Sequence, residues 1–174
     1  MVDIPPTEDR FRSNVIALCS YIHDEAQILT SSGCEGLNPN VIQVAYIFLN
    51  GCDKMALIDG FIERSKLHWD NIKECKEEFF SDKAEEIFSE LPLKHVFTFR
   101  EVIFRKDSNG KAIIAQEKRD IFWEFFHSLV KICIKHIHYN RNPVIIDGRI
   151  TYSKEYHNDI DILTLSKSWE IKLN

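Results

Sequence analysis

The chain has 174 residues, 44% hydrophobic and 11% aromatic, a composition typical of one globular domain with a substantial core and not of a disordered protein. Its formal net charge of -5 argues against a general electrostatic nucleic-acid binder, because such proteins are usually basic. The first residues, MVDIPPTED, have neither the cationic nor the apolar region of a signal peptide, and no run of about 18 apolar residues occurs. We therefore expect a soluble intracellular protein with five reduced cysteines.

Helical periodicity dominates the first third of the chain. Thr7 is placed to cap a helix in which apolar residues recur every three or four positions, and Gly33 is placed to end it. Asn38 and Pro39 can then start a second helix over VIQVAYIFL, although the Val, Ile, Tyr and Phe content leaves a β-strand as the alternative. Asp53 is expected to cap a third helix. The inner face of that helix is predicted to be Met55, Leu57, Ile58, Phe61 and Ile62.

Three further helical segments are expected in the middle of the chain. One spans residues 67–80, a short one follows and is stopped by Pro92, and another spans residues 93–104. The inward-facing residues of the first segment are predicted to be Trp69, Ile72, Cys75 and Phe79. Its Lys and Glu residues are then left facing solvent.

The loop RKDSNGKAIIAQ has the spacing of a calcium-binding EF-hand loop but not its ligands. Asp107, Asn109 and Gly110 occupy the third, fifth and sixth positions, whereas Arg105 stands at the first and Gln116 at the twelfth. A cation at the first position and the loss of the bidentate Glu leave too little negative charge for a divalent ion. No zinc-ligand spacing of Cys and His occurs either, so we predict an Asn-Gly turn and no metal or cofactor.

The stretch DIFWEFFHSLVKICIKHIHY, residues 120–139, is predicted to be the helix around which the others pack, in a helical run beginning near residue 115 or 116. At 100° per residue, six polar side chains fall on one narrow arc and the rest of the circumference is apolar, so this helix needs neighbours on at least two sides. His136 alone interrupts the apolar part, and we interpret it as a hydrogen-bonded histidine of the core or of an interface. The polar arc, expected at the surface, consists of Glu124, His127, Ser128, Lys131, Lys135 and His138.

The last thirty residues change character. Asp147 and Gly148 separate two short apolar runs, the signal of a two-residue β-hairpin. Between residues 163 and 173, apolar and polar residues alternate, which predicts a half-buried strand or hairpin. This tail is suited to lie on a partner or add a strand to its sheet, and equally suited to fold back on its own helices. The predicted partner-binding residues are Leu163, Leu165, Trp169, Ile171 and Leu173.

Together these elements predict a mainly α, single-domain helical bundle around a central buried helix. The helical domain is expected to span residues 1–142. A short C-terminal β-hairpin or strand appendage, residues 143–174, is expected to pack on that domain or on a partner chain.

Two stretches resemble small uncharacterised proteins of nucleocytoplasmic large DNA viruses. The matching residues are FIERSKLHWDNIKECKEEFFSDKAEEIFSELP (61–92) and IFWEFFHSLVKICIKHIH (121–138), a pattern of aromatics, charges and a helix breaker. The resemblance implies a viral protein, late or virion-associated, that works in the host cytoplasm. It transfers no catalytic residue to this chain.

The leading hypothesis is a non-enzymatic structural or protein-interaction component, such as a minor virion or capsid-associated protein, whose partners are other protein chains or further copies of itself. The alternative is a small enzyme with a site near His136 and Cys133, although a thiol buried among apolar residues is inert. Cys75 lies among lysines with no base assigned to it. A nucleic-acid-associated factor is the third hypothesis, using the basic residues Arg100, Arg105, Lys106, Lys111, Lys118 and Arg119.

Overall fold

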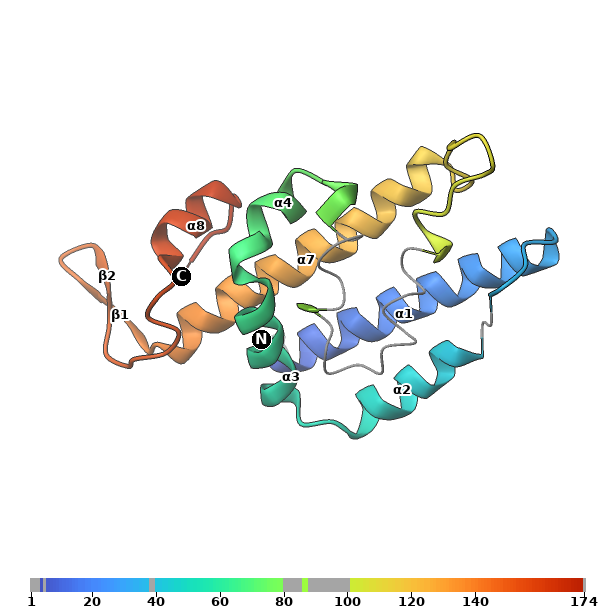
Figure 1. Ribbon diagram of the computed structural model, residues 1–174. Coiled ribbons are helices and arrows are strands. Elements are labelled where there is room, and N and C mark those ends of the chain that lie inside the picture. Colours follow the sequence, from blue (N-terminus) through green and yellow to red (C-terminus); the bar gives the residue numbers. More distant parts are fainter. Residues whose placement is uncertain (1–3, 5, 38–39, 80–85, 88–100, 174) are drawn as a thin grey trace.

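The computed structural model describes residue 4 and residues 6–37, 40–79, 86–87 and 101–173, which form a mainly helical structure with one antiparallel hairpin near the C-terminal end (Figure 1). The predicted fold class is confirmed. Two 25-residue helices, α1 (Thr7–Ser31) and α7 (Gln116–Asn140), lie side by side and form the spine of the molecule. In the described part of the chain, no helix combines the length and apolar character needed to cross a membrane.

Helix α7 is the central element, as its wheel predicts. Eleven of its side chains are buried, including His136, and its first half packs aromatic rings on one another, with the centroids of Phe122 and Phe126 separated by 5.0 Å. The prediction for His138 is wrong, because this member of the polar arc is fully buried. Its ring is covered by the hairpin that follows the helix, and its Nδ1 lies 2.9 Å from the hydroxyl of Tyr152.

Helix α1 begins and ends where its periodicity predicts, but Thr7 does not cap it. The residue before the helix is Pro6, no side chain bonds the first amides, and the Thr7 hydroxyl instead contacts His136 on α7. The apolar positions of α1 face the core, and the buried ones are Phe11, Val15, Leu18, Cys19, Ile22, Ala26 and Leu29.

The next two helices pack on α1. Helix α2 (Val41–Gly51) settles the choice between helix and strand in favour of helix, while the predicted cap at Asn38 and Pro39 lies outside the described residues. Helix α3 (Lys54–Ser65) is capped as predicted, because the Asp53 carboxylate accepts a hydrogen bond from the Ala56 amide at 2.8 Å. Its predicted inner face is buried except for Met55, which is exposed.

The predicted helix over residues 67–80 is interrupted. A short 3-10 helix, η1 (Lys66–His68), runs into α4 (Trp69–Lys73), which ends in a Schellman motif: the Lys76 amide donates to the Asn71 carbonyl at 3.1 Å and Cys75 adopts a positive φ of 56°. Cys75 is therefore exposed and not inward-facing as predicted. Trp69, Ile72 and Phe79 are buried as expected. The predicted helices before and after Pro92 lie largely outside the described residues.

The loop before α7 is the predicted Asn-Gly turn. The Asp107 carboxylate accepts hydrogen bonds from the amides of Asn109 at 2.9 Å and Lys111 at 3.0 Å, and Gly110 takes a φ of 79°. This carboxylate is therefore engaged by the backbone of its own turn.

The hairpin also forms as predicted. Strand β1 (Pro143–Ile146) pairs antiparallel with β2 (Arg149–Tyr152), so that Ile146 lies opposite Arg149 across a two-residue turn. Asp147 and Gly148 both have positive φ values, 52° and 75°, which identifies the type I′ turn that an Asp-Gly pair favours.

The strand predicted between residues 163 and 173 is wrong, because this segment contains α8 (Ile162–Ser168). The Asp161 carboxylate caps the helix by accepting from the Thr164 amide at 3.2 Å, and the Ile171 amide closes its end by donating to the Ser166 carbonyl at 2.7 Å. These hydrogen bonds at the start and the end of the helix outweigh the strand preference that the alternation of apolar residues predicts. Helix α8 then packs against α7 and buries Trp169 there.

Replacement of Trp169 by alanine should lower the free energy of unfolding by about 3–5 kcal/mol, because it removes a buried indole that packs against α7. Leu163→Ala, on the exposed side of α8, should change it by no more than about 0.5 kcal/mol. Urea denaturation of both variants measures the difference. Equal losses would mean that this segment does not bury the face described.

Candidate functional site

The most densely bonded polar group in the described core surrounds His136, near the end of α7. Its imidazole is fully buried, with Nδ1 2.6 Å from Oγ1 of Thr7 and Nε2 2.9 Å from the hydroxyl of Tyr156. Asn140, one turn further along α7, donates from Nδ2 to the His136 carbonyl at 2.8 Å and lies 3.3 Å from Nδ1. The histidine therefore joins the start of α1 to the segment that follows the hairpin.

The contacts assign a direction to every hydrogen bond in this group. The Tyr156 hydroxyl donates to the Asp59 carboxylate, so its oxygen is left to accept from Nε2–H of His136. Nδ1 of the neutral ring is then an acceptor, and the Thr7 hydroxyl donates to it. The result is one directed chain from Thr7 through His136 and Tyr156 to Asp59.

Burial favours the neutral form of this ring. Desolvation lowers the pKa of His136 below its ordinary 6.5, and the carboxylates of Asp59 and Glu8 oppose that shift, each with an oxygen 3.9 Å from a ring nitrogen. Burial, followed by the hydrogen bond to Asp59, raises the pKa of Tyr156 far above its ordinary value. The phenol therefore stays protonated, as its donor role requires.

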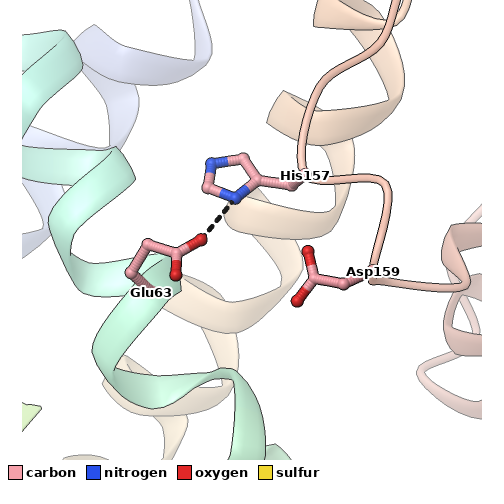
Figure 2. Close-up of side chains that lie close together, drawn as sticks. All are labelled: Glu63, His157 and Asp159. Carbon is pink, nitrogen blue, oxygen red and sulfur yellow. Dashed lines mark hydrogen bonds and ion pairs between the residues drawn. The ribbon is translucent and has the colours of Figure 1, made fainter.

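A second histidine extends the chain toward the surface. His157 Nε2 lies 3.3 Å from Oδ1 of Asp59, and its Nδ1 lies 2.9 Å from Oε1 of Glu63, the contact drawn in Figure 2. Asp59 and Glu63 are one turn apart on α3, so a single face of that helix supplies both carboxylates. The segment after the hairpin is thus attached to α3 as well as to α7.

One group in the described part of the chain has the composition of a metal site: Glu63, His157 and Asp159, whose ligand atoms lie within 4.8 Å of one another (Figure 2). The Lys66 ammonium lies 3.1 Å from Glu63 Oε2 and 2.5 Å from Asp159 Oδ2. The protein thereby supplies its own cation to both carboxylates, and a metal ion would have to displace it. We assign the group to the attachment of the 157–159 segment.

Arg141 fixes the same segment from the end of α7. Its buried guanidinium donates from Nε to the Tyr156 carbonyl at 2.7 Å, and from Nη2 to the Ile160 carbonyl at 3.0 Å and to the His157 carbonyl. Three carbonyls of one loop thus converge on a single cation. This arrangement holds the Tyr156 side chain in register with His136.

Neither Cys133 nor Cys75, the two cysteines considered from the sequence, has the surroundings of a nucleophile. Cys133 is fully buried, and desolvation raises the pKa of its thiol well above the ordinary value, so the predicted site near His136 cannot use it. Cys75 does have a histidine nearby, with its Sγ 3.6 Å from Nε2 of His127. That nitrogen also lies 2.8 Å from the Ile72 carbonyl, which can only accept, so it carries a hydrogen and cannot take the thiol proton.

Half of the predicted basic cluster is bound to other groups of the chain, while Lys106 and Lys111 are exposed. Lys118 and Arg119 are ion-paired with Glu25 at 3.0 Å and Glu77 at 2.7 Å. Arg105 donates to a backbone carbonyl, and Arg100 lies outside the described residues. The structure therefore lends no support to the nucleic-acid hypothesis from this stretch.

The five predicted partner-binding residues are placed mostly against the chain itself. Trp169 is buried, and Leu165, Ile171 and Leu173 are half-buried against the core, while Leu163 is exposed. Of the two possibilities for the tail, folding back on its own helices is the one seen. Partner binding through these residues stays a prediction.

No protein-family model, curated protein or solved structure matches this chain. Evidence on its function therefore comes from the contacts and exposed surfaces of the chain itself. Of the residues that build the buried group, the sequence pattern identifies only His136, by its break in an apolar arc. The prediction of Thr7 as a cap is wrong, and nothing local marks Asp59 or Tyr156, because these two residues are 97 positions apart and His136 is 20 positions from Tyr156.

Tyr156→Phe should lower the free energy of unfolding by about 1–3 kcal/mol, because it leaves His136 and Asp59 without their shared partner in a buried site. Tyr46→Phe is a matched control, since its hydroxyl bonds Ser20 at the surface and its loss should change stability by about 0.5 kcal/mol or less. Equal effects in the two variants would contradict the directed chain.

Stability should fall as the pH drops from about 7.5 to about 5. The pKa of His136 is lower in the folded state than the ordinary 6.5, so below about pH 6.5 the unfolded chain binds more protons and unfolding is favoured. His136→Gln removes this titration, and its free energy of unfolding should depend less steeply on pH than that of the wild type. Denaturant titrations across the range measure both slopes, and identical slopes would refute the buried neutral ring.

Proposed function

We propose that this chain is a protein-interaction component that engages another protein chain through the β1–β2 hairpin. The observation that carries the proposal is the exposure of three consecutive apolar residues on β1: Val144 is 49% exposed, Ile145 65% and Ile146 55%. Successive side chains of a strand point to opposite faces, so β1 exposes apolar side chains on both faces of the hairpin, and exposed apolar surface of this kind marks interaction sites when it extends into a patch. Figure 1 shows the hairpin projecting beyond the helices at the end where α7 stops.

The edges of the hairpin support recognition of a partner's strand. Within the described residues its sheet has two strands, so both edges are open to pairing. In a two-residue hairpin the innermost pair, Ile146 and Arg149, exchanges hydrogen bonds, so the amides of Ile145 and Ile150 point outward. Pro143 has no amide hydrogen, which weakens the outer edge of β1. The edge of β2 is therefore the better template for strand addition.

The base of the hairpin is fixed while its tip is free. Tyr152 bonds His138 at 2.9 Å, the Arg141 guanidinium lies 5.5 Å from the centre of the Tyr152 ring, and the Ser153 amide donates to the Arg141 carbonyl at 3.2 Å. An isolated hairpin is marginally stable in water, so these contacts preserve the shape of the exposed strands. Preorganisation of this kind lowers the entropic cost of binding.

The resemblance of residues 61–92 and 121–138 to proteins of large DNA viruses supports a more specific form of the proposal, a minor virion or capsid-associated component working in the host cytoplasm. The experiment below tests the interaction itself and then the identity of the partner.

Ile145→Asp should weaken association at least tenfold, because it places a charge in the exposed apolar strand, and should leave thermal unfolding unchanged. Leu67→Asp is the matched control, since Leu67 is similarly exposed on η1 and lies outside the hairpin. Analytical ultracentrifugation measures self-association, and cross-linking from Lys154 in the native source identifies a different partner. Association that survives Ile145→Asp, or that Leu67→Asp abolishes equally, would contradict the proposal.

A further inference from the structure

The contact between Thr7 and His136 has the geometry of a nucleophile and its base. The Thr7 hydroxyl donates to Nδ1 of His136 over 2.6 Å, within the range for proton transfer between a catalytic hydroxyl and an imidazole. Nε2 of the same ring is held by the Tyr156 hydroxyl, which is held in turn by the Asp59 carboxylate. This is the order hydroxyl, imidazole, carboxylate that activates serine in hydrolases, with a phenol inserted before the carboxylate.

Thr7 lies in the wall of a cavity. A cavity of about 520 Å³ is lined by Thr7 and Asn140, and by Glu8, Arg10, Lys135 and Lys172 among the charged residues. Thr7 keeps 7% of its surface exposed, whereas His136 behind it is fully buried. Thr7 is therefore the member of this pair that borders the cavity, with the imidazole directly behind it.

The charges around the cavity select for anions. Among the described residues, Arg10 from α1, Lys135 from α7 and Lys172 from the C-terminal segment bring three positive charges to it, against the carboxylate of Glu8. This local excess stands out in a chain whose net charge is -5. The Glu8 carboxylate lies on the inner side, with its Oε2 3.9 Å from His136 Nδ1, where it stabilises a proton on the ring.

The start of α1 adds donors for a developing negative charge. Thr7 is the first residue of this 25-residue helix, and no side chain in the described part of the protein caps its free amides. Backbone N–H groups at a helix start, aimed at the reacting carbonyl, are the usual means of stabilising the oxyanion of acyl transfer. The amides of Asp9 and Arg10 donate to the Pro6 carbonyl, so the oxyanion donors in this proposal are the amides of Thr7 and Glu8.

We propose that Thr7 and His136 form the nucleophile and general base of an esterase site for carboxylic esters that carry an anionic group. Thr7 Oγ1 attacks the ester carbonyl as its proton passes to His136 Nδ1, and that proton then leaves with the alcohol as the ester C–O bond breaks. Water, deprotonated by the same nitrogen, attacks the acyl-threonine, releases the carboxylic acid and returns the proton to Thr7. The net reaction is ester plus water to acid plus alcohol.

This inference is independent of the hairpin and of the proposed interaction. It places an activity near His136, where the enzymatic hypothesis from sequence expected one, with Thr7 in the role that Cys133 cannot fill. Tyr156 and Asp59 act as positioning residues, because they touch the imidazole or each other and not the cavity.

The test compares hydrolysis of the monoanionic 4-nitrophenyl succinate with that of neutral 4-nitrophenyl acetate by the full chain. The wild type should hydrolyse the succinate ester faster than the acetate ester. Thr7→Val keeps the shape of the side chain but removes the hydroxyl, and its catalysed rate should be at least about 100-fold lower than that of the wild type. Thr7→Ser should retain activity, because it keeps the hydroxyl. Lys172→Ala should raise KM for the succinate ester by a larger factor than KM for the acetate ester.

A covalent readout separates catalysis from a structural role. Acid-quenched wild type should carry a succinyl adduct that peptide mass spectrometry locates on Thr7, and this measurement decides the matter even if Thr7→Val does not fold. Absence of turnover above buffer, an adduct at another residue only, or equal rates for the wild type and a folded Thr7→Val would overturn the proposal. If Ile145→Asp loses association but keeps esterase activity, the esterase site is independent of the proposed interaction.

Discussion

The buried imidazole of His136 ties together parts of the chain that are far apart in sequence. Its two nitrogens face the first residue of α1 and the loop after the hairpin, and through Tyr156 they reach α3. A polar ring inside an apolar helix face is costly to bury unless every nitrogen is satisfied, so the surrounding segments must arrive in one arrangement. The placement of α1, α3 and the C-terminal segment relative to α7 depends on this condition.

The need to satisfy both nitrogens of His136 also accounts for how the C-terminal segment is attached to the helices. Between residues 153 and 161 the chain has no regular structure, yet Arg141 holds three of its carbonyls, and Asp59 and Glu63 hold His157. These bonds position the segment so that α8 packs against α7 and Trp169 is buried in the core. The hairpin is left as the part of this region that faces away from the helices, which is why its apolar residues are exposed.

Much of the helical frame could be predicted from the sequence, because each helix carries its own periodicity, caps and breakers. The bounds of α1 and α7, the Asp53 cap and the Asp-Gly turn all depend on neighbouring residues. Failures occurred where a non-glycine residue takes a left-handed conformation, as at Cys75 and Glu170, and ends a helix that composition alone does not stop. The alternation over 163–173 predicts a strand, whereas Asp161 caps a helix there and Glu170, in the left-handed conformation, ends it.

The candidate sites were harder to predict, because their partners are distant in the chain. His136 stood out by breaking an apolar arc, but the pattern could not say which residues would meet it. Thr7 satisfied the rules for a helix cap and was assigned to one, whereas tertiary contact gave its hydroxyl a different role. The exposed strand of the hairpin was predictable as a strand, and its exposure was not.

The protonation state of His136 tests the central claim most directly. Two-dimensional NMR that correlates the ring nitrogens with the ring protons distinguishes the two neutral tautomers and the imidazolium. The directed chain from Thr7 to Asp59 predicts a neutral ring at pH 7 with its proton on Nε2. A proton on Nδ1, or a doubly protonated ring at that pH, would contradict both the hydrogen-bond directions and the role of the imidazole as a base.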